Sequence, residues 1–499
     1  MASASPQVGD VDVYPLFEFD KEKAVDKMNM AWMFHVDKPL DPELLRSSLS
    51  RLLQMGDWKK FAGRFKRNGA GQLELHTPRI FPDNYSIIGY SHRDLSPLRA
   101  ADHEIAGKIP TAALETSSYA IQPRFHDLFH HSNNDVDPND DIETWIREQL
   151  PPLALHVTTF SDATTVSLLW RHNLADGGGM TALVSAWSLV LGGQEDHVPK
   201  LLGARESVLD KVGEKKEKDA EDWVMKDKAL GRWATLKMLS QLGLKRQLRV
   251  HEFHLRHISL SSANVQRLRE RSLTALDRKG LQRPESLGNS LLIRALFLKM
   301  AVQAESKVRN VLLIMPVDSR RRLPAFQEAD GVYVQNMLSW VFMSLPIEIV
   351  LGPLASLALE ISRHIEKQST PAQVSAFFRY IKERSQDPNK GMLYFTENPG
   401  NEFPVTFNDL TPLDIRNKVD FGPAVVKTHD ADAGRSGREN ARFFMQETMG
   451  DSFSTSTRAR LPQILCSGKD AFGNYFFRGT LSKDSWESLG RALESDEPI

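Results

Sequence analysis

Hydrophobic residues along this chain recur at two spacings, one typical of helices and one typical of strands. Residues 39–54 carry leucines every three or four positions after an Asp-Pro start, which predicts an amphipathic helix. Residues 164–171 alternate between two faces and predict a strand. Strand-like stretches such as 311–315 and helix-like stretches such as 354–367 then follow one another. This order predicts a mixed α/β fold.

The strand predicted at 164–171 leads directly into the hexapeptide His172-Asn173-Leu174-Ala175-Asp176-Gly177. Three glycines follow from Gly177, and the hydrophobic spacing over 180–191 predicts a helix. A neutral imidazole, with an ordinary pKa of about 6.5, can take a proton from an alcohol that attacks a thioester and return it to the departing thiolate. Backbone N–H groups or a hydroxyl could stabilise the oxyanion. The hexapeptide alone leaves open whether His172 is this base or a core histidine beside a helix cap.

Length and composition set the outer limits. The chain has 499 residues, 41% of them hydrophobic, which is enough for two domains. A charged stretch predicts a crossover linker at 206–239, between an amino-terminal lobe 1–205 that carries the hexapeptide and a carboxy-terminal lobe 240–499. Basic residues number 63 and acidic residues 64, so the net charge of −1 gives no general attraction to nucleic acid or to an anionic membrane.

Targeting and metal signals are weak. The amino-terminal segment lacks a basic flank followed by an apolar stretch, and no run of eighteen apolar residues occurs, so a cytoplasmic protein is expected. The single cysteine, Cys466, rules out an internal disulfide. His251, His254 and His257 lack the HExxH spacing, and in a strand His254 would face away from the other two. We therefore expect no metal site.

Four further motifs follow a familiar order. Residues 61–64 read Phe-Ala-Gly-Arg, residues 317–322 read Val-Asp-Ser-Arg-Arg-Arg, Asn336 follows fourteen residues later, and residues 420–424 read Asp-Phe-Gly-Pro-Ala. Together with the hexapeptide at 172–177, they give the chain a resemblance to BAHD-type acyl-CoA-dependent acyltransferases. The likeness extends over nearly the whole chain and is strongest to the fungal, trichothecene acetyltransferase-like branch.

This resemblance implies a two-domain, chloramphenicol-acetyltransferase-like α/β fold with the active-site channel between the domains and one strand borrowed across their interface. In that fold His172 is the catalytic general base. Asp176 points away from the chemistry and forms a structural salt bridge with Arg320, and with Gly177 these residues support the site. Thr406 is the nearest match to the family's threonine that faces the thioester carbonyl, and it is the candidate oxyanion contact.

The last motif matches the family pattern only in part. Asp420, Phe421 and Gly422 agree with the first half of DFGWG, whereas Pro423 and Ala424 replace its Trp and Gly. In the family this segment organises a loop and the coenzyme A side of the fold. The departure therefore bears on donor binding more than on catalysis.

The predicted function is transfer of an acyl group, acetyl by default, from acyl-CoA to a hydroxyl, less readily an amine, of a secondary metabolite. No bound cofactor is expected, acyl-CoA is the co-substrate, and a monomer is predicted. One alternative is a condensation-domain-like enzyme that uses a carrier-protein thioester, although Arg171 occupies the place of that group's second histidine. The other is a non-catalytic binding protein on the same scaffold, which the incomplete DFGWG motif suggests and the complete hexapeptide opposes.

Overall fold

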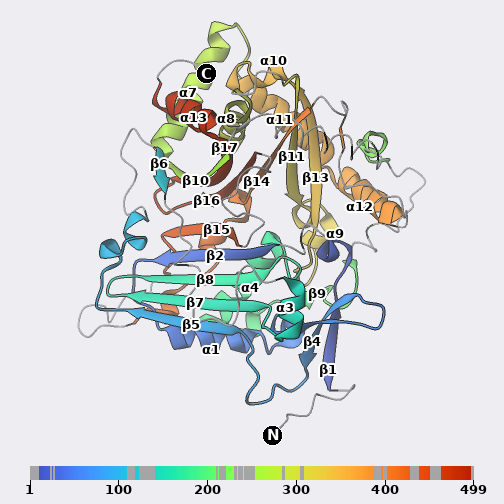
Figure 1. The fold of residues 1–499 in the computed structure, drawn as a ribbon, viewed down its shortest axis with the longest axis vertical. Helices are drawn as coiled ribbons and strands as arrows, with labels where there is room; N and C mark the ends of the chain where they lie inside the picture. The colour runs from blue at the N-terminus through green and yellow to red at the C-terminus, as the bar shows by residue number, and fades with distance from the viewer. Residues whose placement is uncertain are drawn as a thin grey trace.

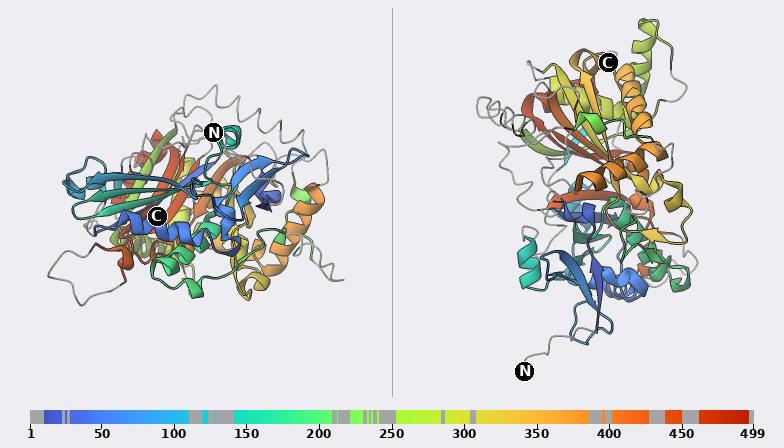
Figure 2. Two further views of the ribbon diagram at one scale, coloured as in Figure 1. Left: turned by 90° about the horizontal axis from the view of Figure 1, so that it is seen from below. Right: turned by 90° about the vertical axis from the view of Figure 1, so that its right-hand side faces the viewer.

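The computed structural model describes residues 10–495 except for seventeen short gaps. The gaps are 23–24, 26–27, 110–118, 123–127, 129–140, 209–211, 213–220, 230–232, 234–235, 237–239, 241–252, 284–286, 304–307, 386–394, 397–401, 427–437 and 450–461. Two sheets lie one above the other along the long axis, with the amino terminus at the lower end and the carboxy terminus near the upper end (Figures 1 and 2). Mixed α/β architecture, as predicted, is confirmed.

The lower lobe is built on a five-stranded sheet with helices packed behind it (Figure 1). Its strands, in spatial order, are β15 (Phe443–Met449), β2 (Asn29–Val36), β8 (Thr164–Arg171), β7 (Leu153–Phe160) and β5 (Gly89–Leu95). Helices α1 (Pro42–Leu52) and α4 (Gly177–Leu191) pack against each other, and their apolar faces join Trp32 and Trp170 of the sheet in one core. The predicted helix over 39–54 and the predicted strand–turn–helix around His172 are both confirmed.

The upper lobe is built on a seven-stranded sheet. Its strands, in spatial order, are β13 (Leu338–Pro346), β11 (Asn310–Asp318), β14 (Glu402–Asp409), β16 (Gln463–Lys469), β17 (Tyr475–Ser482), β10 (Phe253–Leu260) and β6 (Tyr119–Gln122). Helices α7 (Ser262–Arg278), α8 (Asn289–Gln303), α11 (Leu354–Gln368) and α13 (Lys483–Glu494) pack together on it. Helix α8 buries every residue from Leu292 to Leu298, which explains why its sequence is apolar on nearly all sides.

The two lobes exchange strands in both directions. Strand β15 comes from the carboxy-terminal part of the chain and pairs antiparallel with β2 at the edge of the lower sheet. Strand β6 comes from the amino-terminal part and pairs antiparallel with β10 at the edge of the upper sheet. One borrowed strand was expected, and the structure has two. Neither lobe therefore completes its sheet from its own half of the chain.

Smaller elements complete the two lobes. They are the sheet of β1 (Val11–Pro15), β4 (Leu73–Pro78) and β3 (Arg64–Arg67), the pair β12 (Val332–Tyr333) and β9 (Leu201–Leu202), and helices α3 (Ile142–Arg147), α9 (Pro324–Gln327), α10 (Ile347–Val350) and α12 (Pro371–Ser385). Much of the predicted linker 206–239 lies outside the described residues, so its bounds remain a prediction. Trp223, within this stretch, is buried against Phe377 and Phe395 of the upper lobe.

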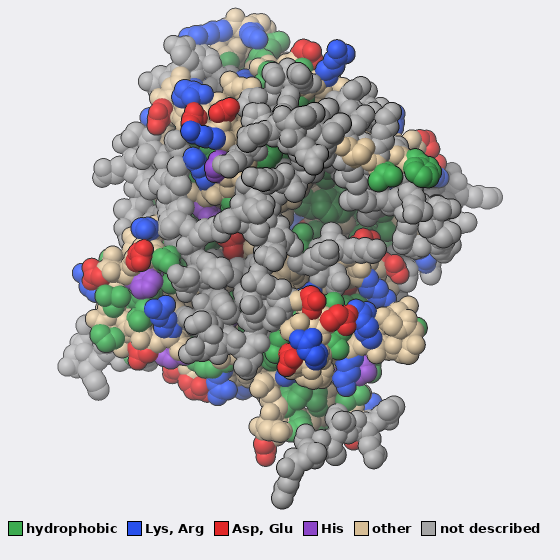
Figure 3. All heavy atoms as spheres, viewed as in Figure 1, with side chains coloured by type: hydrophobic (Ala, Val, Ile, Leu, Met, Phe, Trp, Pro, Cys, Tyr) green, Lys and Arg blue, Asp and Glu red, His purple; other side chains and the backbone are tan. Residues whose placement is uncertain are grey.

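The surface fits the near-zero net charge. Basic and acidic side chains intermingle over the described part of the face in Figure 3, and neither sign dominates there. Among the described residues, no helix has both the length and the apolar character needed to cross a membrane.

Candidate active site

His172 lies in the tight turn between β8 and α4. Its backbone N–H donates to the Met28 carbonyl (2.9 Å), and the N–H of Leu174 donates back to Arg171 (2.9 Å). On the other side of the turn, the Trp170 indole N–H donates to the Ala175 carbonyl (2.9 Å). These bonds fix the backbone that carries the imidazole, because two of them close the turn and the bond to Met28 ties it to the residue before strand β2.

Asp176 caps helix α4 and faces Arg320. One carboxylate oxygen accepts from the N–H of Gly179 (2.8 Å) and the other from the N–H of Met337 (2.8 Å). The Arg320 guanidinium lies 3.0 Å from Asp176, which is only 1% exposed. Arg320 also donates to the Tyr333 carbonyl (2.9 Å). The carboxylate is thus shared between a helix cap and a buried ion pair.

In this arrangement Asp176 forms no hydrogen bond with the His172 imidazole. Among the described residues, Nδ1 of His172 is buried without a hydrogen-bond partner. A Ser-His-Asp relay requires a carboxylate bonded to that nitrogen. The geometry therefore matches the expected pairing of Asp176 with Arg320 and provides no relay.

Burial lowers the pKa of His172, and the carboxylates of Asp176 and Asp20 oppose that effect. A lowered pKa keeps the imidazole neutral at physiological pH, which is the form that accepts a proton. Asn336 adds a further restraint, because its Nδ2 donates to the His172 carbonyl (2.9 Å). The turn therefore presents a neutral, firmly held imidazole.

The glycines after Asp176 are required by close packing. A Cβ on Gly178 would lie 2.6 Å from a guanidinium nitrogen of Arg320, and one on Gly179 would lie 2.4 Å from the Val334 carbonyl oxygen. The predicted support residue, Gly177, is less restricted, since its Cβ would meet Leu413 at 3.4 Å. Contact with Arg320 and Val334 thus accounts for Gly178 and Gly179 without any ligand.

The neighbouring arginines differ in burial. Arg171 is buried, donates to the Asn29 side-chain oxygen (3.3 Å) and lies over the Trp145 ring. Arg321 is exposed and donates to the Pro412 carbonyl, and Arg322 is exposed as well. Only Arg320 of the three consecutive arginines reaches the hexapeptide.

Thr406 lies on β14, on the sheet face opposite the helices. Its neighbours Val405 and Phe407 point into the core beneath helix α8, so the period of two places Thr406 on the other face. On the adjacent strand β16, Leu465 uses that same face to pack into the lower lobe's core. Thr406 is therefore placed toward the space between the lobes, and among the described residues no hydrogen bond joins its side chain to His172.

The Asp420-Phe421-Gly422 segment fastens a loop to the lower lobe. Asp420 accepts from the N–H groups of Gly422 (2.9 Å) and Glu439 (2.8 Å) through one oxygen. Phe421 is fully buried and packs edge-on against Phe34 and Trp187. These contacts hold the loop without the Trp and Gly that the motif usually carries.

The Phe61-Ala62-Gly63-Arg64 motif also has a structural explanation. Arg64 is buried and donates to the carbonyls of Ala62 and Gly63 (3.0 Å each), to the Tyr85 hydroxyl (3.1 Å) and to Ser86. Its guanidinium thereby joins the end of one 3₁₀ turn to a distant loop.

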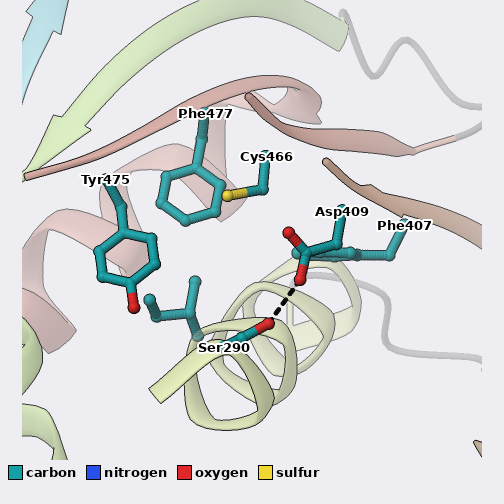
Figure 4. A pocket seen from close by; sticks show the side chains of 7 residues that line it. Ser290, Phe407, Asp409, Cys466, Tyr475 and Phe477 are labelled. Carbon is teal, nitrogen blue, oxygen red and sulfur yellow. Dashed lines mark hydrogen bonds between the residues drawn. The ribbon is translucent and has the colours of Figure 1, made fainter. Parts of the chain in front are cut away.

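A narrow crevice in the upper lobe contains polar groups away from the hexapeptide (Figure 4). Asp409 accepts there from Ser290 (2.5 Å) and from Arg294 (3.0 Å), and Cys466 and Tyr475 line the other side. Burial raises the pKa of the Cys466 thiol well above its usual value, so the thiolate is disfavoured. The crevice is too narrow for a water molecule and holds a structural ion pair.

No cluster of His, Cys, Asp and Glu with metal-binding geometry occurs among the described residues. His257 is buried and bonds to Glu447 (2.8 Å), which also accepts from Arg478 (2.8 Å). His254 lies on the same strand, β10, and His251 lies outside the described residues.

Sequence reasoning missed two charged residues beside the site, Asp20 and Lys60. Both are buried, and neither belongs to a recognised motif. The one local signal is a lysine between Trp58 and Phe61, two large apolar residues that are themselves buried. Asp20 has no comparable signal in the sequence.

A family model described as the Transferase family matches residues 134–422, a segment that contains His172, Arg320, Thr406 and Asp420. The chain belongs to this family. It is the BAHD-type acyltransferase family that the motifs resemble, and the fungal branch is supported by two relatives. Acetyltransferase sphE of Aspergillus fumigatus is 27% identical, covering 98% of this chain and 96% of its own length. O-acetyltransferase PaAT-2 of Phomopsis amygdali is 25% identical, with 97% of each chain covered.

The fold of this Transferase family member is also found among solved structures. TRI101 of F. sporotrichioides, crystallised with coenzyme A and T-2, superposes with a TM-score of 0.61 over 96% of this chain and 97% of its own. Sequence identity is 12%, so the likeness concerns the fold. It confirms the predicted two-domain, chloramphenicol-acetyltransferase-like architecture.

Proposed function

We propose that this family member is an acyl-CoA-dependent O-acyltransferase that moves an acyl group, acetyl by default, to a hydroxyl of a secondary metabolite. The observation that carries the proposal is the state of His172. Its ring is buried and its pKa lowered, its backbone is held on two sides, and Asp176 is engaged by Arg320 instead. These are the properties of a general base that works at neutral pH.

In the proposed reaction, the imidazole of His172 removes the acceptor's hydroxyl proton as the oxygen attacks the thioester carbon. The carbonyl oxygen becomes an oxyanion, for which the Thr406 hydroxyl and backbone N–H groups are the candidate donors. Collapse of this intermediate breaks the carbon–sulfur bond. The imidazolium then returns the proton to the thiolate, so that ester and free thiol leave and the enzyme is unchanged.

Free acyl-CoA is the proposed donor. Two observations support it: a relative of the same fold was crystallised with coenzyme A, and Arg171 stands where carrier-dependent condensation domains usually place a second histidine. Arg171 is buried against Asn29 and Trp145, so a histidine would not fill its place. The loop of Asp420, Phe421 and Gly422 is proposed to organise the donor side. A monomeric, cytoplasmic enzyme and the lobe bounds 1–205, 206–239 and 240–499 remain predictions.

The donor proposal predicts multiple turnovers with acyl-CoA. Purified protein, a set of short-chain acyl-CoAs and a panel of candidate alcohols should release free thiol and form ester, followed by mass spectrometry. The His172→Ala variant is the matched blank for spontaneous hydrolysis and transfer. If every acyl-CoA is inert while an acylated carrier protein reacts, the condensation-type alternative holds. If neither donor reacts and the protein still binds small alcohols, a non-catalytic binding role holds.

A further inference from the structure

Asp20 accepts hydrogen bonds from Asn173 and Asn336, two residues next to the turn that carries His172. Its carboxylate oxygen Oδ1 accepts from the backbone N–H of Asn336 (2.9 Å) and from the Nδ2 of the same residue (2.7 Å). Its backbone carbonyl accepts from the Nδ2 of Asn173 (2.6 Å), the residue directly after His172. Asn336 in turn donates to the His172 carbonyl. Asp20 therefore reaches the base from two directions without touching it.

The position of Asp20 is itself fixed. It lies in the 3₁₀ turn Glu18–Lys21, where its second carboxylate oxygen accepts from the N–H of Phe17 (3.2 Å). The side chain is 1% exposed. Asp20 and Asn336 are more than three hundred residues apart. The bond between them therefore joins the amino-terminal segment to the residue that donates to the His172 carbonyl.

The charge of Asp20 is not balanced by a direct contact. Within the described part of the chain, no basic side chain forms an ion pair with it. Lys60 is fully buried on the 3₁₀ helix Gly56–Ala62, and its ammonium nitrogen has no hydrogen-bond partner among the described residues. Burial lowers the pKa of Lys60, and the charges of Asp20 and Asp176 oppose this effect. A buried ammonium without a hydrogen-bond partner is costly, so burial favours the neutral amine of Lys60.

We propose that Asp20 is a positioning residue for His172. This inference rests on the proposed role of His172 as general base. Asp20 keeps Asn336 in the orientation that holds the His172 carbonyl, so the imidazole stays aligned with the acceptor oxygen. The charged groups that act on the imidazole are then the carboxylates of Asp20 and Asp176, and Arg320 is bound to Asp176.

The proposal is tested with two substitutions of Asp20 that separate its hydrogen bonds to Asn336 from its negative charge. Asp20→Ala removes the acceptor of both Asn336 bonds, and we expect kcat to fall about ten- to a hundred-fold because the base is misaligned. The KM values for donor and acceptor should stay near wild type, since Asp20 lies behind the turn. Asp20→Asn keeps the size and removes the charge; with its amide oxygen toward Asn336 it keeps both Asn336 bonds and loses only the bond from the Phe17 N–H.

The pH profiles give the readout that a structural role would not change. In Asp20→Asn a negative charge that raises the pKa of His172 is lost, so the acid limb of kcat/KM should move to lower pH. Glu18→Gln is the matched control, because Glu18 is an exposed carboxylate on the same 3₁₀ turn as Asp20. Its profile should equal that of the wild type.

Each outcome decides the matter. An unchanged kcat and pH profile in folded Asp20→Ala and Asp20→Asn would reduce Asp20 to a structural residue, even with His172→Ala inactive. If the Asp20 variants fail to fold, Asn336→Ala decides, because it removes the Nδ2 bonds both to Asp20 and to the His172 carbonyl. An unchanged kcat in folded Asn336→Ala would refute the positioning. Full activity of His172→Ala would instead overturn the proposed function.

Discussion

Replacing His172 with alanine is expected to lower kcat by about 10²- to 10⁴-fold, the usual contribution of a general base. The neutral alcohol is a weak nucleophile until its proton is removed, and Asp176 is occupied by Arg320 and cannot substitute. The fold should persist, because the turn is closed by backbone bonds that alanine also makes. The measurement is kcat at saturating donor and acceptor, with thermal melting and coenzyme A binding as checks on folding.

His197→Ala is the matched control, since His197 is an exposed histidine shortly after helix α4. It should retain the activity of the wild type. A folded His172→Ala variant with wild-type kcat would refute the mechanism.

The same base predicts the pH dependence. Activity requires neutral His172 and is lost as the pH falls through its pKa. Burial lowers that pKa, so the acid limb of kcat/KM should lie below the value of about 6.5 of an unperturbed histidine. An acid limb of kcat/KM that lies above this value and is lost only in His172 variants would contradict a buried and neutral base.

Truncating Arg320 should cost roughly 3 to 5 kcal/mol in the free energy of unfolding, because the Asp176 carboxylate is left buried without its ion-pair partner. Truncating Asp176 should cost less in ion pairing, because Arg320 keeps its ion pair with Asp318 (3.0 Å). Asp176 is 1% exposed and the Arg320 side chain 13% exposed, so water screens the pair little. Asp176→Ala would also remove the cap of helix α4. A loss of this size is a large share of the stability of a domain. Thermal and denaturant melts of the two single variants and the double variant measure it.

The double variant should lose less stability than the two single losses added together, because the partners contact each other. Arg322→Ala is the control: it lies two residues from Arg320, is exposed, and should change the melting temperature little. Strictly additive losses would refute the pairing. Normal melting of Asp176→Asn together with a depressed kcat would instead assign Asp176 a direct catalytic role.

The sequence was most informative where the relevant interactions are local. The period of two over 164–171 and the helical spacing after Gly179 reported which side of each element is buried, and that sufficed to place His172 at a strand end before a helix. The motif resemblance added the Asp176–Arg320 pairing, which spans 144 residues and which no local spacing could give.

The placement of the other candidates needed the tertiary structure. Gly177 belongs to the hexapeptide, yet Gly178 and Gly179 are the glycines that Arg320 and Val334 approach most closely, because that packing comes from a segment far along the chain. The face occupied by Thr406 depends on Leu465 of the adjacent strand, which packs into the other lobe.

By itself, the sequence determined the α/β class, the helix that begins after Asp41, the frame around His172 and the family's order of motifs. Only the tertiary structure decided the reciprocal exchange of β6 and β15 and the burial of Asp20 and Lys60. The physical reason is that periodicity records whether a position faces the interior, whereas hydrogen bonds and charge balance depend on which distant segment meets it there. Asp20 and Asn336 illustrate this, since neither has a local pattern that names the other.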